Sequence, residues 1–172
     1  MKNEVLKQHL AEIRNGDKYA FETLYSGLKT PVFTIISRVT WDRAVSEEIL
    51  QDVFVKLFMS PPDPSIKNPR AYIFRMARNL AIDNMKNRKQ TISIDEIHDP
   101  AHDPLNNVST RMDINDALKS LPSLECQIVT LHIIGGLKFR EIAEVMDAPL
   151  GTVLWRYQKA IGKLRTILGG TL

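Results

Sequence analysis

The sequence predicts an all-α protein, built as two small helical domains joined by a flexible linker. Apolar residues recur at helical spacing along most of the chain, and no segment shows the sustained alternation of a strand. A segment with Asp-Pro and Asn-Asn pairs and little apolar periodicity separates the two periodic regions. The 172 residues suffice for two small domains. We therefore place the domains at residues 1–90 and 111–172, with the linker at 91–110.

Four apolar segments at helical spacing open the first domain. The first ends at Gly16, and Asp17 is expected to cap the second. A third helix follows, and a fourth begins near Asp42. The apolar residues of the four segments are, in order, Val5, Leu6, Leu10 and Ile13; Phe21, Leu24 and Tyr25; Val32, Ile35, Ile36 and Val39; and Ile49, Leu50, Val53, Phe54, Leu57 and Phe58.

A proline-rich stretch, Ser60 to Pro69, precedes a strong helix from about Arg70 to Arg88. The stretch cannot be regular helix, because three of its prolines fall within four residues. The helix has an apolar face and an opposite basic face about 80° wide, which Ile82 interrupts. The apolar face carries Ile73, Met76, Ala77 and Leu80, and the basic face carries Arg75, Arg78, Lys86 and Lys89. Tyr72 and Phe74 add two rings, for which burial is the commoner role.

The second domain has the spacing of a helix-turn-helix. Gly135 and Gly136 end an apolar helix, and residues 146–149 form the turn between two further helices. The expected core residues are Leu118, Leu121, Leu124, Ile128, Val129, Leu131, Ile142, Ala143 and Val145. The last helix has an apolar stripe of Val153, Tyr157, Ile161, Leu164 and Leu168 and an opposite face of Thr152, Trp155, Arg156, Lys159 and Lys163. An ordinary helical hairpin with a solvated basic face is the alternative.

Charge is unevenly distributed along the chain. Residues 60–91 carry an excess of +5, residues 92–120 carry −4, and from Leu150 onward there are four basic residues and no acidic one. Two basic segments separated by an acidic one indicate two contacts with a polyanion. The alternative is an unevenly charged solvated surface.

Several classes of protein are disfavoured. The single cysteine, Cys126, excludes an internal disulfide framework and fits a reducing, cytoplasmic location. No signal peptide or run of about 20 apolar residues is present, so we expect no membrane insertion. There is no GxxxxGK[ST] phosphate loop and no catalytic His/Asp/Ser constellation, so we expect neither an enzyme nor a cofactor. His98 and His102, with nearby carboxylates, are a weak zinc candidate.

The segment LKSLPSLECQIVTLHIIGGLKFREIAEVMDAPLGTV resembles the fourth conserved region of extracytoplasmic-function sigma factors. Its matching motifs are Leu-Pro at 121–122, Gly-Leu at 136–137, Glu-Ile-Ala at 141–143 and Gly-Thr-Val at 151–153. The resemblance implies that Thr152, Trp155, Arg156, Lys159 and Lys163 read an upstream promoter element and that the domain touches the polymerase flap. Lys138, Leu154 and Trp155 depart from the pattern, which leaves the promoter sequence open.

The other half resembles the second conserved region of the same family, in NPRAYIFRMARNLAIDNMKNRK and WDRAVSEEILQDVFVKLF. The resemblance implies that the loop at 60–68 forms a pocket for a flipped base. Basic groups can hold a phosphate backbone while rings stack on unpaired bases. The expected downstream-element residues are Tyr72, Arg75, Arg78, Asn79 and Lys86, and the expected contacts with the polymerase clamp are Glu48, Gln51 and Asp52.

The sequence thus favours a sigma factor, whose partners would be core RNA polymerase, promoter DNA and, as the resemblance allows, an anti-sigma factor. A stand-alone helix-turn-helix regulator is the alternative, and it would require only the second domain for DNA binding. The proline-rich loop followed by an aromatic and basic helix argues against that alternative.

Overall fold

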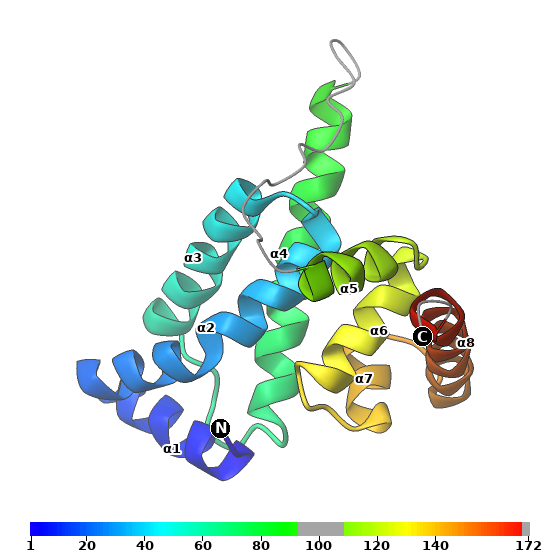
Figure 1. Cartoon of the computed structure of the whole chain (residues 1–172). Coiled ribbons are helices and arrows are strands. Elements are labelled where there is room, and N and C mark those ends of the chain that lie inside the picture. The colour runs from blue at the N-terminus through cyan, green and yellow to red at the C-terminus, as the bar shows by residue number, and fades with distance from the viewer. Residues whose placement is uncertain (93–108, 170–172) are drawn as a thin grey trace. The chain divides into compact units, whose positions relative to one another are not determined.

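The computed structural model describes the backbone of residues 1–92 and 109–169, and side chains over 1–88 and 114–169. Within these ranges it contains eight α-helices and no strand, which confirms the all-α class (Figure 1). The chain divides into two compact units near residue 94. Most of the linker expected at 91–110 lies outside the described residues.

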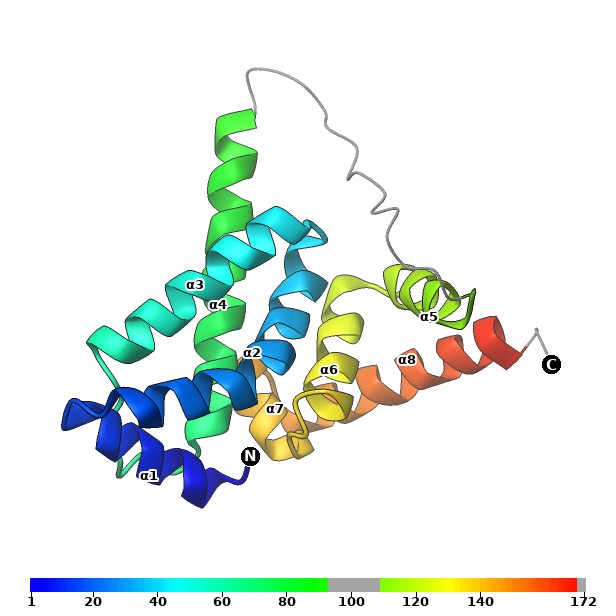
Figure 2. The same ribbon diagram turned by 60° about the vertical axis from the view of Figure 1, so that its left-hand side comes forward.

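The first unit is a bundle of four helices. These are α1 (Asn3–Arg14), α2 (Lys18–Thr40), α3 (Arg43–Met59) and α4 (Pro69–Ile92). The central helix α2 packs against the other three, and α4 also contacts α1 and α3. The largest fully buried side chains of this unit are Leu6, Leu10, Leu24, Leu28, Ile36, Ile49, Leu57, Ile73 and Phe74. In both views the C-terminal turns of α4 project beyond its partners (Figure 2).

The second and third helices expected from the sequence are one continuous helix, α2, with Pro31 inside it. A proline within a helix costs about 3 kcal/mol, because it removes a backbone hydrogen bond and crowds the preceding turn. Leu24, Leu28 and Val32 are each fully buried, so one apolar row continues across the proline. Burial of each such side chain contributes about 1.5–3 kcal/mol, which outweighs the local cost.

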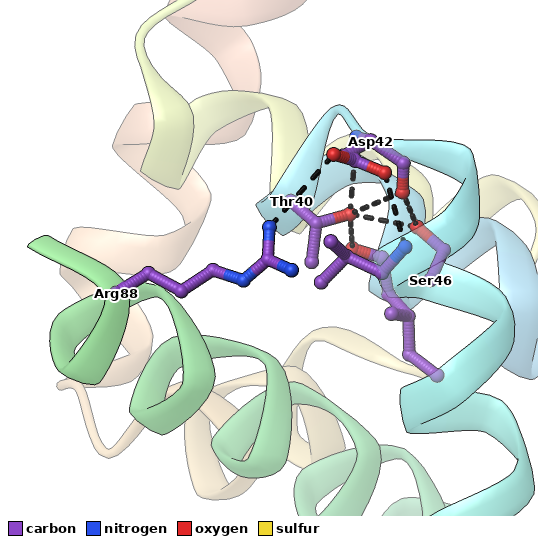
Figure 3. A network of polar contacts seen from close by, with 6 residues as sticks. Thr40, Asp42, Ser46 and Arg88 are labelled. Atoms are coloured by element: carbon purple, nitrogen blue, oxygen red, sulfur yellow. Dashed lines mark hydrogen bonds and ion pairs between the residues drawn. The ribbon is translucent and has the colours of Figure 1, made fainter. Parts of the chain in front are cut away.

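The corner between α2 and α3 is closed by a small polar network (Figure 3). Asp42 caps α3, because its Oδ1 accepts the N–H of Val45 at 3.0 Å. The hydroxyl groups of Thr40 and Ser46 are 2.7 Å apart, and Ser46 Oγ donates to the Asp42 carbonyl at 2.6 Å. Arg88 of α4 approaches the other Asp42 carboxylate oxygen at 3.9 Å. The network therefore links the start of α3 to the distal part of α4.

The second unit contains α5 (Ser109–Lys119), α6 (Ser123–Ile133), α7 (Phe139–Met146) and α8 (Leu150–Gly169). The long helix α8 packs against the other three, and α6 also contacts α7 (Figure 2). Three rings join α6, α7 and α8: His132 stacks on Phe139 with centroids 4.5 Å apart, and Tyr157 meets both edge-on. His132 Nδ1 also lies 2.9 Å from the Leu137 carbonyl oxygen.

Five residues of the predicted apolar faces are exposed. Val5, Leu124 and Leu168 are 42%, 40% and 38% exposed, and Tyr25 and Phe58 are 36% and 42% exposed, although each has helical spacing to buried residues. Val5, Phe58, Leu124 and Leu168 lie in the first or last turns of their helices, where a helix end leaves the packed interface. Tyr25 lies within α2, and its ring packs edge-on against Phe54 with centroids 4.7 Å apart. Periodicity assigns such residues to a face without showing where along the helix that face is covered.

Candidate nucleic-acid and polymerase interfaces

A helix-turn-helix occupies the second unit, as predicted. Helix α7 ends at Met146, Asp147 adopts a left-handed conformation with φ 51°, and α8 begins at Leu150. Lys138 precedes α7 without a Ser or Thr acceptor at this position, but Glu141 reaches back and accepts the Lys138 backbone N–H at 2.7 Å. The start of α7 is therefore stabilised by the acidic half of a capping box.

The predicted upstream face of α8 is largely accessible. Thr152, Trp155, Lys159 and Lys163 are exposed, while Val153 and Ala160 on the other side are buried. Arg156 is half-buried, at the edge of this face nearest to α6. The Lys159 ammonium lies 4.9 Å from the Trp155 ring centroid, so the departure from the family pattern at 155 adds an aromatic partner for a cation.

Sequence reasoning missed an acidic group beneath this face. Glu125, in the first turn of α6, is 1% exposed. Its Oε1 atom lies 3.8 Å from Arg156 Nη1 and 3.9 Å from Lys159 Nζ. The available signal was a charged residue within the apolar run of α6, but the sequence does not show that this residue faces α8.

Four of the five predicted downstream-element residues form one exposed stripe on α4. Tyr72, Arg75, Asn79 and Lys86 are all exposed and fall within about 60° on a helix of 100° per residue. Arg78 is half-buried at the edge of the stripe. Burial lowers the pKa of its guanidinium, which nevertheless remains a cation near neutral pH.

The proline-rich loop before α4 is held by Asp63. Its Oδ1 accepts the backbone N–H of Ser65 at 2.8 Å, and its Oδ2 lies 3.2 Å from Arg14 Nη1 at the end of α1. Hydrogen bonds from Ser65, assisted by Arg14, lower the pKa of the Asp63 carboxyl. Asn68 ends the loop by accepting the Ala71 N–H at 3.1 Å, which caps α4.

The predicted clamp contacts lie on the outer side of α3. Glu48, Gln51 and Asp52 are exposed, and the opposite side of the helix is buried through Ile49 and Val53. The two acidic groups and the amide are thus available to a partner without disturbing the core.

Metal binding receives no support from the described part of the chain. The weak zinc candidate, His98 and His102, lies outside the described residues. Among the residues described, no group of three or more His, Cys, Asp or Glu side chains is arranged to hold a metal ion.

None of the helices within the described residues is long and apolar enough to cross a membrane.

The chain combines a four-helix bundle with a helix-turn-helix unit, and each unit presents an exposed helix face that carries basic side chains. Two family models match the chain: Sigma-70 region 2 over residues 24–91 and Sigma-70, region 4 over residues 111–164. Together these matches cover more than half of the sequence. The chain belongs to the sigma-70 family of RNA polymerase sigma factors, within its extracytoplasmic-function group.

Curated relatives match along nearly their full length. The chain is 26% identical to the ECF RNA polymerase sigma factor SigK of Mycobacterium sp. (strain JLS), covering 93% of this chain and 89% of the relative. It is 25% identical to the protein of the same name from Mycobacterium ulcerans (strain Agy99), with coverage of 97% and 95%.

Two solved structures share the fold. One is the sigma factor RpoE in complex with the anti-sigma factor NepR from Bartonella quintana, with a TM-score of 0.73, 19% identity and coverage of 87% of this chain and 96% of that chain. The other is CnrH in complex with the cytosolic domain of CnrY, with a TM-score of 0.69, 19% identity and coverage of 95% and 97%.

Proposed function

We propose that this protein directs core RNA polymerase to specific promoters and helps to melt them, without catalytic activity of its own. The observation that carries the proposal is the presence of two separate cationic surfaces, on α4 and α8, in a chain that matches both sigma-70 regions. A stand-alone regulator would leave the stripe on α4 and the acidic side of α3 without a role. Run-off transcription with core polymerase and genomic fragments tests the proposal directly.

Each of the three exposed helix faces has its own proposed partner. The α3 residues Glu48, Gln51 and Asp52 contact the polymerase clamp, and the second unit also contacts the flap. The α4 stripe engages the melted downstream element, with the flipped base held near the 60–68 loop. The α8 face reads the upstream element. The protein acts in the cytoplasm, and an anti-sigma factor is a further partner, as in the complexes of the two structural neighbours.

Reversing the charge of Asp52 is expected to weaken binding to core polymerase. The carboxylate is exposed on α3, so Asp52→Lys should leave the fold intact while placing a cation against the clamp. A like-charge contact across an interface costs several kcal/mol, so affinity should fall at least tenfold. A pull-down titration with core enzyme measures this. Glu22→Lys, an exposed reversal on α2, is the matched control, and equal affinities for the two variants would contradict the assignment.

Loss of the α8 cations should impair the first, closed step of promoter binding. Each of Arg156→Ala and Lys159→Ala should cost about 1–3 kcal/mol if the side chain contacts a base, or less if it contacts only phosphate. Holoenzyme binding to a duplex promoter in a mobility-shift titration measures the loss. Lys119→Ala, on the exposed surface of α5, serves as the control for a lost positive charge.

Loss of Asn79 should impair opening rather than initial binding. Asn79 is exposed in the middle of the α4 stripe, where its amide can contact an unpaired base. Asn79→Ala holoenzyme should therefore transcribe poorly from duplex and recover on a template whose downstream element is already unpaired. Failure of the pre-melted template to restore transcription, by a variant that folds and binds core enzyme, would show that the role is wrong.

A further inference from the structure

Glu125 is a buried acidic group to which the proposed function gives no role. Its side chain is 2% exposed, and Oε2 has no hydrogen-bond partner. A carboxylate removed from water in this way is costly unless nearby cations compensate it. The position therefore calls for an explanation beyond ordinary packing of α6.

The compensating cations are two of those that α8 presents to DNA. Arg156 Nη1 and Lys159 Nζ converge on the same oxygen, Oε1, at 3.8 and 3.9 Å. Both distances exceed a normal hydrogen bond, so the attraction is Coulombic and does not fix the direction of any N–H group. The two basic side chains are also 30% and 47% exposed, which leaves them within reach of a phosphate from solvent.

We propose that Glu125 is an internal competitor of DNA phosphate that restrains the upstream face of α8. A phosphate that draws Arg156 and Lys159 outward leaves the buried carboxylate uncompensated, so every such contact carries a cost. Phosphate contacts are independent of sequence and dominate non-specific binding. Glu125 therefore suppresses attachment of the protein to DNA that is not a promoter. This inference rests on the proposed DNA contact of α8.

A positioning role for Glu125 fits the geometry less well. A carboxylate that orients an arginine for base reading does so through short, directed hydrogen bonds. Neither contact of Glu125 reaches that length. The ring of Trp155 is 56% exposed and lies near both cations. It can make cation–π contacts with them, but it carries no net charge and so does not compete with phosphate as Glu125 does.

The test is Glu125→Gln in the full chain, with a scrambled duplex of fixed length as the probe. Removing the carboxylate should raise non-specific affinity and steepen its salt dependence. Each released cation that gains a phosphate should increase the ratio of affinities at 50 and 200 mM salt about threefold, or roughly tenfold for both. Fluorescence anisotropy measures affinity, with Glu144→Gln, an exposed residue of α7, as the matched control.

Two further variants distinguish failure of the proposed role of Glu125 from failure of the proposed DNA contact of α8. Glu125→Asp keeps the charge but retracts it by one methylene, so it should change affinity in the same direction by less. In an Arg156→Ala, Lys159→Ala background, Glu125→Gln should have no effect. Weaker binding by Glu125→Gln, or binding equal to that of Glu144→Gln, would overturn the inference while leaving the α8 contact intact. If the double alanine background binds DNA as the unaltered chain does, the α8 assignment fails, and the inference fails with it.

Discussion

Phe74→Ala is expected to unfold the first unit at ambient temperature or bring it close to unfolding. Phe74 is completely buried in α4, the helix that contacts α1, α2 and α3. Truncating a buried phenylalanine to alanine costs about 3–5 kcal/mol, through lost transfer energy and the cavity left behind. Small domains are stable by only about 5–15 kcal/mol, so the loss removes a large share of the total.

Urea denaturation can follow each unit separately, because Trp41 lies in the first unit and Trp155 in the second. In a Trp155→Phe background, the remaining tryptophan fluorescence reports the first unit alone. The matched control is Tyr72→Ala, which removes a neighbouring ring that is 40% exposed and should cost much less. Equal unfolding midpoints for Phe74→Ala and Tyr72→Ala would contradict the distinction between a core ring and a surface ring.

The same pair of variants separates stability from promoter opening. Tyr72→Ala should remain folded and bind core polymerase, yet lose open-complex formation if its ring stacks on an unpaired base. Stacking of a base on an aromatic ring contributes about 1–3 kcal/mol. Phe74 cannot contribute such stacking while the helix bundle is intact, because no part of its ring reaches solvent.

Local chemistry made much of the fold predictable from the sequence. Asp17 caps α2 as expected, and α3 begins beside Asp42 as expected, because a helix start depends on a side chain and the two or three backbone groups beside it. Gly136 has a φ of 65° after α6, as expected of a glycine that ends a helix. The opposite faces of α3 and α8 also followed from a period of 3.6 residues, which requires no tertiary information.

The features that the sequence did not predict depend on contacts between residues that are distant in sequence. Pro31 reads locally as a helix break, but burial of Leu28 and Val32 on either side of it keeps α2 continuous. Glu125 lies 31 positions before Arg156 in the sequence, and only the packing of α6 on α8 brings them together. The roles assigned to the α3, α4 and α8 surfaces remain predictions, since they depend on partners as well as on this chain.

Duplex DNA should be bound only weakly by the free protein. Helix α8 offers four cations, and two of these already face Glu125. A protein with so few phosphate contacts binds duplex non-specifically with a Kd of about 10⁻⁴–10⁻⁶ M near physiological salt. The second cationic surface, on α4, belongs to a separate unit, and linked sites reinforce one another only when their geometry allows both to engage.

Core polymerase should raise the affinity for promoter DNA by several orders of magnitude, because it would hold both units at a fixed separation and add its own DNA contacts. Specific protein–DNA complexes typically reach about 10⁻⁸–10⁻¹¹ M. We therefore expect holoenzyme to bind a promoter fragment, identified by run-off transcription, at least about a thousandfold more tightly than the free chain. Anisotropy titrations of promoter and scrambled duplexes, with and without core enzyme, measure the difference. Sequence-specific nanomolar binding by the isolated chain would contradict the expectation and favour a stand-alone regulator, since α8 and its neighbours would then suffice for recognition without a second surface.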